Sequence, residues 1–245
     1  MPELSHELLR SGLRGPARPP LLGRLIGRTL RVAYRLARRD RYDDFRLEWL
    51  DGMPLMVIPS VFNPKLLRTG AFLAAQIDAQ LLHPQQRVLD MGTGSGVCAV
   101  RAARRAQRVL AVDLNPAAVR CARINALLNQ VEARLEVRQG DLFAPLAGER
   151  FDLILFNPPF LRGEPRDERE RAWRAGDVAQ RFAAGLRQHL RPGGCALLLL
   201  SSFGDAGAFL APLQRHGLNV TALSERRFVN EHLVIYRVSA AAEEP

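Results

Sequence analysis

Cysteine is scarce in this chain of 245 residues, which holds only Cys98, Cys121 and Cys195. These three lie far apart, without the spacing of a zinc site or of a redox-active pair, and they are too few for a disulfide-stabilised scaffold. The sequence therefore predicts no metal centre. It indicates small buried thiols in a reducing compartment, so we expect a cytoplasmic protein.

Long hydrophobic runs are also missing. The longest uninterrupted apolar stretch extends only from Cys195 to Leu200, far short of the roughly 20 residues that a helix needs to cross a bilayer. The N-terminal region has no continuous apolar segment like that of a signal peptide. We expect neither a membrane span nor a signal peptide.

Lysine is nearly absent, because of 35 basic residues only Lys65 is a lysine, against 25 acidic residues. The net charge of +10 therefore comes from arginine, and arginine binds phosphate and carboxylate groups well. A codon bias toward arginine explains the same composition. The charge is mild evidence for an acidic partner.

Acidic residues are absent from Arg10 to Arg39. Within this run, apolar residues recur at helical spacing over residues 22–37, and arginines at 24, 28, 31, 35 and 38 form a stripe on another face. The pattern predicts an amphipathic basic helix. Two roles stay open for it: packing on the main domain with a solvated arginine face, or contact with RNA, an acidic protein or a membrane surface. We divide the chain into an Arg-rich helical extension (1–60) and a catalytic domain (61–245), and expect a monomer.

Beyond residue 66, helical and strand patterns alternate. We expect helices over 66–82, 96–106, 116–129, 177–190 and 205–216, and strands over 87–90, 108–112, 135–138, 151–156, 195–201, near 220 and over 233–238. Such alternation, with strands apolar on both faces, predicts an α/β fold with a doubly wound, seven-stranded, mostly parallel Rossmann-like sheet. No helix separates the last two strands, so the final one should be antiparallel.

A glycine-rich loop follows the strand that ends at Asp90. Gly92, Gly94 and Gly96 precede a helix, so the backbone there can approach a ligand closely at the carboxyl end of the sheet. The dinucleotide fingerprint would need its third glycine at 97, where a valine stands, and this speaks against a nicotinamide-dependent dehydrogenase.

Carboxylates end the next two strands. Asp113 can accept both hydroxyls of a ribose at this edge; capping the helix at Pro116 is its other possible role, although Asn115 is better placed for that. Asp141, after the following strand, could meet the exocyclic amine of an adenine. The combination of glycine loop and ribose carboxylate is much more specific than either part.

Asn157, Pro158, Pro159 and Phe160 directly follow the strand at 151–156. The prolines stiffen the backbone and remove two N–H donors. This leaves the Asn157 side-chain oxygen and the Pro158 carbonyl as acceptors for both hydrogens of a planar NH2 group, with the Phe160 ring available for stacking. Two such acceptors can stabilise the positive charge that develops as the nitrogen attacks a methyl group. A stiff turn without function is the alternative.

These residues carry a resemblance. The chain from about 60 to 238 resembles the class I S-adenosylmethionine-dependent methyltransferases whose fourth strand ends in Asn-Pro-Pro-aromatic. It is most similar to the release-factor glutamine methyltransferases and their eukaryotic and archaeal relatives. The segment from Phe62 to Thr69 resembles that family's upstream Pro-x-x-x-Thr element with one residue of slippage, and Phe160 replaces the usual tyrosine. Bacterial members carry a longer helical release-factor-binding domain in front.

The resemblance implies N-methylation of a planar NH2 group with S-adenosyl-L-methionine as cofactor. The favoured substrate is a protein glutamine of the release-factor type; an RNA base (the exocyclic amine of adenine or guanine) and an inactive cofactor-binding scaffold are the alternatives. The partner is then a macromolecule, protein or RNA, with the basic helix as a further nucleic-acid contact. The catalytic candidates are Asn157, Pro158 and Phe160. The cofactor-binding candidates are Thr69, Asp90, Gly92, Thr93, Gly94, Gly96, Asp113, Leu114, Asp141, Leu142 and Asn157.

The loop over 161–176 is charged. It follows Asn157, Pro158, Pro159 and Phe160, which we call the amide clamp. It either folds over the substrate, with Trp173 as an apolar anchor, or is a solvated surface loop.

Overall fold

A computed structural model describes residues 14–17, 44–78, 80–159 and 177–240. The contacts within the chain divide it into two compact units. The first comprises residues 40–157 and 188–197, and the second holds the remaining residues. The predicted basic helix, Phe160 and the loop over 161–176 lie outside the described residues.

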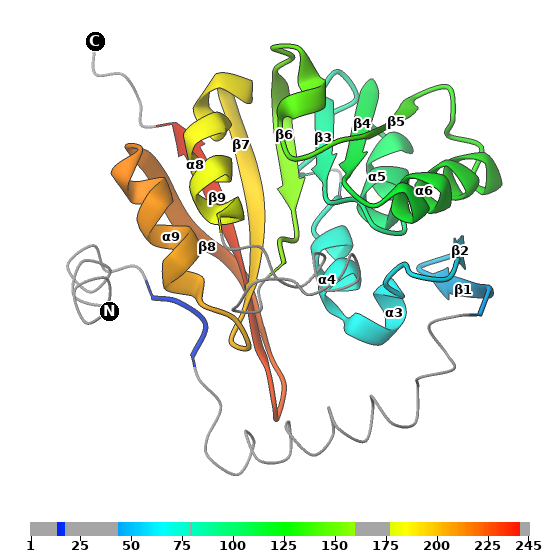
Figure 1. Cartoon of the computed structure of the whole chain (residues 1–245), viewed down its shortest axis with the longest axis horizontal. Helices are drawn as coiled ribbons and strands as arrows, with labels where there is room; N and C mark the ends of the chain where they lie inside the picture. Colours follow the sequence, from blue (N-terminus) through cyan, green and yellow to red (C-terminus); the bar gives the residue numbers. More distant parts are fainter. Residues whose placement is uncertain (1–13, 18–43, 79, 160–176, 241–245) are drawn as a thin grey trace. The chain divides into compact units, whose positions relative to one another are not determined.

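The first unit contains the glycine loop and most of the parallel strands. Its elements are β1 (Arg46–Leu50), β2 (Met53–Val57), α3 (Pro64–Leu67), α4 (Thr69–Ala75), β3 (Arg87–Met91), α5 (Val97–Ala103), β4 (Arg108–Asp113), α6 (Pro116–Leu128), β5 (Leu135–Gln139), the 3-10 turn η1 (Ala144–Leu146) and β6 (Phe151–Phe156) (Figure 1). Helix α5 packs on β3 and β4, and α6 packs on β4 and β5.

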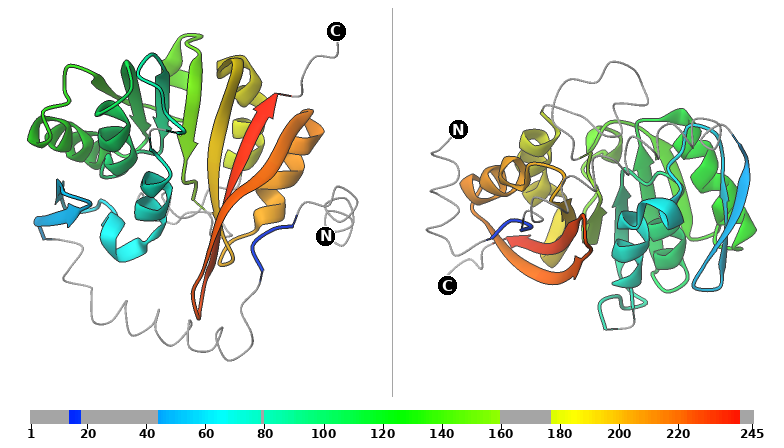
Figure 2. Two further views of the ribbon diagram at one scale, coloured as in Figure 1. Left: turned by 180° about the vertical axis from the view of Figure 1, so that it is seen from behind. Right: turned by 90° about the horizontal axis from the view of Figure 1, so that it is seen from below.

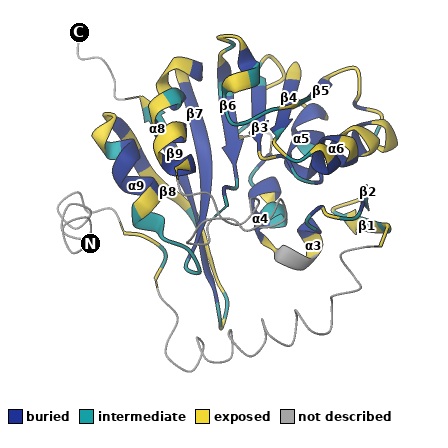
Figure 3. Ribbon diagram, in the orientation of Figure 1, coloured by how far each residue is buried: buried dark blue, intermediate teal, exposed yellow. Residues whose placement is uncertain are grey.

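Strand β3 lies at the centre of this unit. It pairs in parallel with β4 on one side and with β6 on the other, and β4 pairs in parallel with β5. Val88 and Leu89 are fully buried, as are Ile154 and Leu155 of β6, and Figure 3 shows the same burial along β3, β4 and β6. Strands covered on both faces need apolar residues at successive positions, which is the pattern that the sequence shows.

The second unit ends the chain. Helix α8 (Val178–His189) and strand β7 (Leu190–Ser201) have residues in both units, while α9 (Ala206–Arg215), β8 (Leu218–Arg227) and β9 (His232–Ala240) belong to the second. Strands β8 and β9 form a long antiparallel pair with a bulge between Ala222 and Ser224 (Figure 2), which confirms the predicted direction of the last strand.

Hydrogen bonding orders the seven strands β5-β4-β3-β6-β7-β9-β8. The predicted fold class, a seven-stranded and mostly parallel α/β sheet, is confirmed. No helix in the described part of the chain has both the length and the apolar character needed to cross a membrane.

A two-stranded antiparallel sheet, β1–β2, precedes the parallel strands and was not among the predicted elements. Its turn is Asp51-Gly52, where both residues have positive φ (47° and 73°), as a tight hairpin turn requires. Strand β2 runs along α6, since the Met56 N–H donates to Asn125 Oδ1 at 2.6 Å. The hairpin therefore belongs to the packed unit that holds the glycine loop.

The helix predicted over 66–82 is wrong. The chain forms the short α3, breaks at Arg68 with φ of 58°, and continues as α4 only to Ala75. Beyond it, the Asp78 carboxylate accepts hydrogen bonds from the N–H groups of Gln80 and Leu81. A side chain that bonds the backbone two and three residues ahead favours a turn over a continuing helix.

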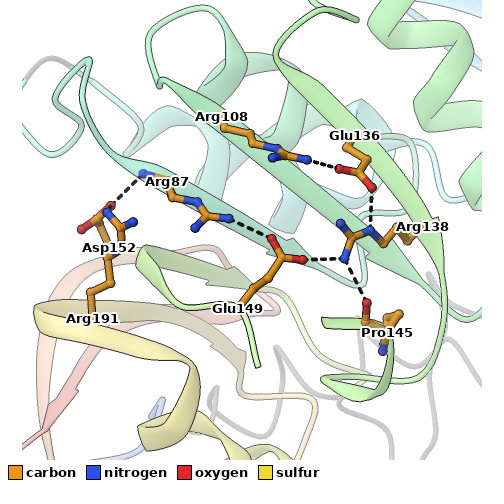
Figure 4. Close-up of polar contacts among 8 residues, drawn as sticks. All are labelled: Arg87, Arg108, Glu136, Arg138, Pro145, Glu149, Asp152 and Arg191. Atoms are coloured by element: carbon orange, nitrogen blue, oxygen red, sulfur yellow. Dashed lines mark hydrogen bonds and ion pairs between the residues drawn. The ribbon is translucent and has the colours of Figure 1, made fainter. Parts of the chain in front are cut away.

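An ion-pair network, hereafter the arginine–carboxylate network, joins β3, β4, β5 and the segment before β6 (Figure 4). Glu149 accepts from both Arg87 (2.8 Å) and Arg138 (2.6 Å), and Glu136 bonds Arg138 and Arg108. Arg87 and Arg108 begin β3 and β4, whereas Glu136 and Arg138 lie along β5, so the network connects the starts of two strands to the length of a third.

Candidate active site

The glycine loop between β3 and α5 is tied to the end of β4. The N–H groups of Gly92 and Thr93 donate to the Val112 carbonyl at 2.8 and 3.1 Å. Gly92, Gly94 and Gly96 have φ of 65°, 55° and 82°, a region that residues with a Cβ rarely adopt. The loop conformation therefore favours glycine at all three positions.

The three glycines differ in their surroundings. A Cβ on Gly96 would lie 3.0 Å from Cα and Cβ of Ala122 in α6, whereas a Cβ on Gly94 would meet no atom within 4 Å. Gly96 thus permits close packing of the loop on α6. Gly94 leaves open space beside the backbone, as a site for a bound ligand needs.

Asp90 lies beneath the loop and is almost fully buried. Its Oδ2 accepts from the Thr93 hydroxyl at 2.6 Å and from the Ala99 N–H at 3.0 Å. Burial raises the pKa of this carboxyl to about 7, although both hydrogen bonds act in the opposite direction. These contacts fix the loop to the first turn of α5, so Asp90 shapes the site from behind.

Asp113 ends β4 and faces the loop. Its Oδ2 accepts from the Gly94 N–H at 2.8 Å, and its Oδ1 accepts from the Asn115 N–H at 2.9 Å. Burial raises the pKa of the carboxyl, opposed by these backbone hydrogen bonds. Leu114 also donates a backbone hydrogen bond to this carboxylate, and a carboxylate with about four lone-pair sites can still accept from a hydroxyl of a diol. Asn115 caps α6 through the Ala117 N–H, as the sequence indicated.

The end of β5 lies beside Asp113. The Gly140 N–H donates to the Asp113 carbonyl at 3.0 Å, which places Asp141 at the same edge. Leu142 follows with φ of 48°, and Leu114 is 44% exposed. The three residues predicted to lie beside the adenine, Asp141, Leu142 and Leu114, are therefore close to Asp113, the predicted ribose ligand.

Asn157 follows β6 and contacts a residue 88 positions earlier in the chain. Its Nδ2 donates to Oγ1 of Thr69, the first residue of α4, at 3.2 Å. Oδ1 of Asn157 is buried and has no hydrogen-bond partner within the described structure. Since a buried polar atom without a partner carries a free-energy penalty, it marks a place where a ligand can supply the missing donor. Pro158, the next residue, is buried.

Asn125 supports the loop and was not among the predicted site residues. It is fully buried in α6, and its Nδ2 donates to the carbonyls of Met56 and of Ser95, within the glycine loop. The signal for it was an amide on the otherwise apolar face of a helix, between alanines 122 and 126.

In chemical terms, the arrangement offers open space beside a glycine, a carboxylate with free lone pairs, and a buried acceptor one strand away. It has no group of three histidine, cysteine or acidic side chains placed to hold a metal, within the part of the chain that the structure describes.

Residues 53–225 match the family described as "Methyltransferase small domain". The chain belongs to this family. A release factor glutamine methyltransferase of Moorella thermoacetica is 33% identical over 87% of this chain and 83% of its own length. Another, from Cereibacter sphaeroides, is 40% identical over 62% of this chain and 58% of its own length.

Among solved structures, the T. thermophilus 16S rRNA N2 G1207 methyltransferase, in complex with AdoMet and guanosine, is similar in fold. Its TM-score is 0.61 at 21% identity, over 81% of this chain and 50% of that chain. This chain thus spans only about half to three fifths of the length of some relatives. Membership of the family confirms the predicted enzyme class, a methyltransferase, and S-adenosylmethionine as its predicted methyl donor.

Proposed function

We propose that this chain transfers a methyl group to the side-chain amide nitrogen of a glutamine in a protein of the release-factor type. The observation that carries this proposal is the unpartnered, buried Oδ1 of Asn157, in a side chain that Thr69 holds through Nδ2. A planar NH2 group supplies the donor that this oxygen lacks. The similarity to release factor glutamine methyltransferases supports the same substrate.

S-adenosylmethionine, when bound, supplies the methyl group from its sulfonium. The residues present fit such a donor: Asp113 can accept the ribose hydroxyls, and the space beside Gly94 admits the ligand against the backbone. Asp141, Leu114 and Leu142 would line the adenine. Because this ligand carries no phosphate, a glycine loop and one carboxylate suffice to hold it.

Asn157 and Pro158 act on the substrate amide. Asn157 Oδ1 and the Pro158 carbonyl would each accept one hydrogen of the NH2 group and so orient its nitrogen for attack. The two oxygens would stabilise the positive charge that the nitrogen gains on methylation, as the methyl–sulfur bond of the donor breaks and S-adenosylhomocysteine leaves. The amide of Asn157 cannot take a proton near neutral pH, so the proton leaves to water. Phe160 would stack on the amide plane.

Binding of the donor is tested by calorimetry with S-adenosylhomocysteine. We expect binding by the wild-type protein and a Kd at least about tenfold higher for Asp113→Ala, because charged hydrogen bonds to the ribose are lost. Leu223→Ala, an exposed residue of β8, is the control. Absence of binding by the wild type would contradict the proposal and favour an inactive scaffold.

The substrate is tested with tritiated donor. The protein is incubated with a recombinant release factor and, separately, with ribosomal RNA, and each product is treated with protease or ribonuclease. Label that protease releases from the release factor supports glutamine methylation. Label that only ribonuclease releases would instead support methylation of an RNA base, which the net charge of +10 also suits.

The remaining assignments belong to the same proposal. We propose a cytoplasmic monomer whose residues 61–245 form the catalytic domain and whose residues 1–60 assist in holding the macromolecular substrate. Replacing Arg24, Arg28, Arg31 and Arg35 with Gln should weaken substrate capture and leave S-adenosylhomocysteine affinity unchanged. Unaltered kinetics of that variant at low and high salt would remove the extension from the proposal.

A further inference from the structure

Large apolar side chains are exposed mainly in one region of the first unit. Of the nine exposed ones in the described part of the chain, six lie on α6 or on β1 and the residue before it. We call these six the apolar patch. Its members are Phe45, Leu47, Trp49, Ile124, Leu127 and Leu128.

Two hydrogen bonds join the parts of the patch. The Met56 N–H donates to Asn125 Oδ1 at 2.6 Å, and Asn129 Nδ2 donates to the Pro54 carbonyl at 2.8 Å. Strand β2 is thereby fixed along α6, and Figure 1 shows the hairpin beside this helix. The β1 residues that pair with Met56 and Pro54 are Leu47 and Trp49.

The backbone beneath the patch is therefore anchored, because Asn125 is fully buried and bonded through both atoms of its amide. Trp49 is 59% exposed and Leu127 62% exposed. Large apolar side chains that stay exposed on an anchored backbone are typical of surfaces that bind a partner.

Charges beside the patch indicate the chemistry of that partner. Helix α6 contains no acidic residue, and its exposed positions also include Arg120 and Arg123. The acidic residues that flank β1, Asp44 and Asp51, are paired with Arg46 and Arg101. A second copy of this chain would bring the same arginines and a further net charge of +10, so like charges oppose self-association. A partner with an apolar surface bordered by Asp and Glu would both cover the apolar side chains and pair with the arginines. Nucleic acid would satisfy the arginines but not the exposed leucines and isoleucine.

The patch extends away from the candidate site. Helix α6 begins three residues after Asp113 and continues for 13 residues to Leu128, which at 1.5 Å per residue carries Leu127 and Leu128 about 20 Å from Asp113. At its other side the patch approaches the glycine loop, since Asn125, the neighbour of Ile124, donates to the Ser95 carbonyl at 2.8 Å. A ligand that reaches from Asp113 to Leu128 must be a macromolecule.

We infer that the apolar patch is the docking surface for the protein that carries the methylated glutamine, through an apolar surface bordered by acidic side chains. This inference rests on the proposed function, and it adds a second contact that determines which protein reaches the site.

The test compares two substrates: an intact recombinant release factor, and a short synthetic peptide that carries its methylated glutamine. The variant is Trp49→Ser combined with Leu127→Ser in the full chain. Val229→Ser, which alters a 74% exposed apolar side chain outside the patch, is the matched control. For the double variant we expect KM for the intact release factor to rise roughly tenfold or more, because central aromatic contacts dominate such interfaces. The kcat/KM for the peptide, the affinity for S-adenosylhomocysteine and all parameters of the control should stay unchanged.

An unchanged KM for the intact protein would overturn the docking inference while leaving the proposed function intact. Absence of methylation by the wild type would contradict both. Analytical sedimentation provides a further measurement. If the wild type self-associates and the double variant does not, the patch binds a second copy of this chain, and the inference is overturned. An equal loss of activity on protein and peptide would show damage to the site and would also overturn it.

Discussion

At the scale of single residues, the site depends on which atoms already have partners. The Asp113 carboxylate accepts from the backbone N–H groups of Gly94, Leu114 and Asn115, and Asn157 uses only its nitrogen. The types and spacing of these residues could be predicted from the sequence, because they follow consecutive strands. Their hydrogen-bond partners could not be predicted. Thr69 is separated from Asn157 by 88 positions, and the threonine hydroxyl can bond in many directions.

Thr69 orients Asn157, and its replacement should affect catalysis more than binding. Thr69→Val keeps the shape of the side chain and removes the oxygen that accepts from Asn157 Nδ2. We expect kcat to fall roughly 3- to 10-fold, the range expected for one lost hydrogen bond. Thr69→Ser should retain most of the activity. We expect equal S-adenosylhomocysteine affinity in all three proteins, which would exclude the cofactor contact predicted for Thr69 from the sequence. A valine variant as active as the serine variant would remove this role.

Asp90 should make stability depend on pH. Its pKa of about 7 in the folded protein lies above the value near 3.9 of an unfolded aspartate. The folded state therefore holds the proton at pH values where the unfolded state has lost it. The contribution of Asp90 to stability is fully present near pH 4 and is lost as the pH rises through about 7, by at most about 1.4 kcal/mol per pH unit.

Denaturant unfolding of the wild type and of Asp90→Asn between pH 4 and pH 8 checks this expectation. The asparagine keeps an acceptor for Thr93 and Ala99 and cannot titrate. As the pH rises, the unfolding free energy of the wild type should fall relative to that of Asp90→Asn. Above the pKa of Asp90 the difference should stay constant. Parallel curves would mean that the carboxyl does not titrate in this range.

At the scale of elements, the sequence predicted the strands better than the segments before them. The strands from Arg87 to Phe156 are apolar runs bounded by turns, and such runs can be recognised from the local sequence alone. The β1–β2 hairpin was missed although Asp51-Gly52 is a strong turn signal, because Leu47 and Trp49 place apolar residues on its exposed face. The break at Arg68 has only a weak local signal, the poor helix formers Thr69 and Gly70 that open α4.

Close packing between the glycine loop and α6 yields an element-scale prediction. Gly96→Ala introduces a Cβ at 3.0 Å from the backbone and side chain of Ala122, at a φ of 82°. We expect a loss of unfolding free energy of about 2–4 kcal/mol, from backbone strain and overpacking together. Gly148→Ala is the control, because its φ is 77° and its Cβ would meet nothing within 4 Å. It should lose only about 1 kcal/mol. Equal losses in thermal or urea unfolding would exclude a packing role for Gly96.

At the scale of the whole molecule, the two ends of the parallel strands have different tasks. The carboxyl ends carry the candidate site, and the amino-terminal ends of β3 and β4 carry Arg87 and Arg108 of the arginine–carboxylate network. The fold class could be predicted because alternating helices and strands permit few arrangements. The arginine–carboxylate network could not be predicted, because the chain has 35 basic and 25 acidic residues. Their numbers alone do not specify which residues form ion pairs.

The network should contribute little to stability, and less at high salt. Its side chains are 22–54% exposed, and ion pairs of that exposure are weak. For Glu149→Gln, which removes the charge facing both Arg87 and Arg138, we expect a loss of about 1 kcal/mol or less at low ionic strength. The loss should shrink in 0.5 M salt, where the screening length is only about 3–8 Å. A larger loss that salt leaves unchanged would indicate buried, rigid pairs.

The position of β3 between β4 and β6 has a consequence for biosynthesis. As the ribosome releases the chain, the glycine loop emerges early, but one edge of β3 has no partner until residues 151–156 follow. Asn157 comes directly after that strand, so the amide clamp is added in the same step that closes the centre of the sheet. A nascent chain halted before this point would expose an apolar strand edge and call for chaperone protection.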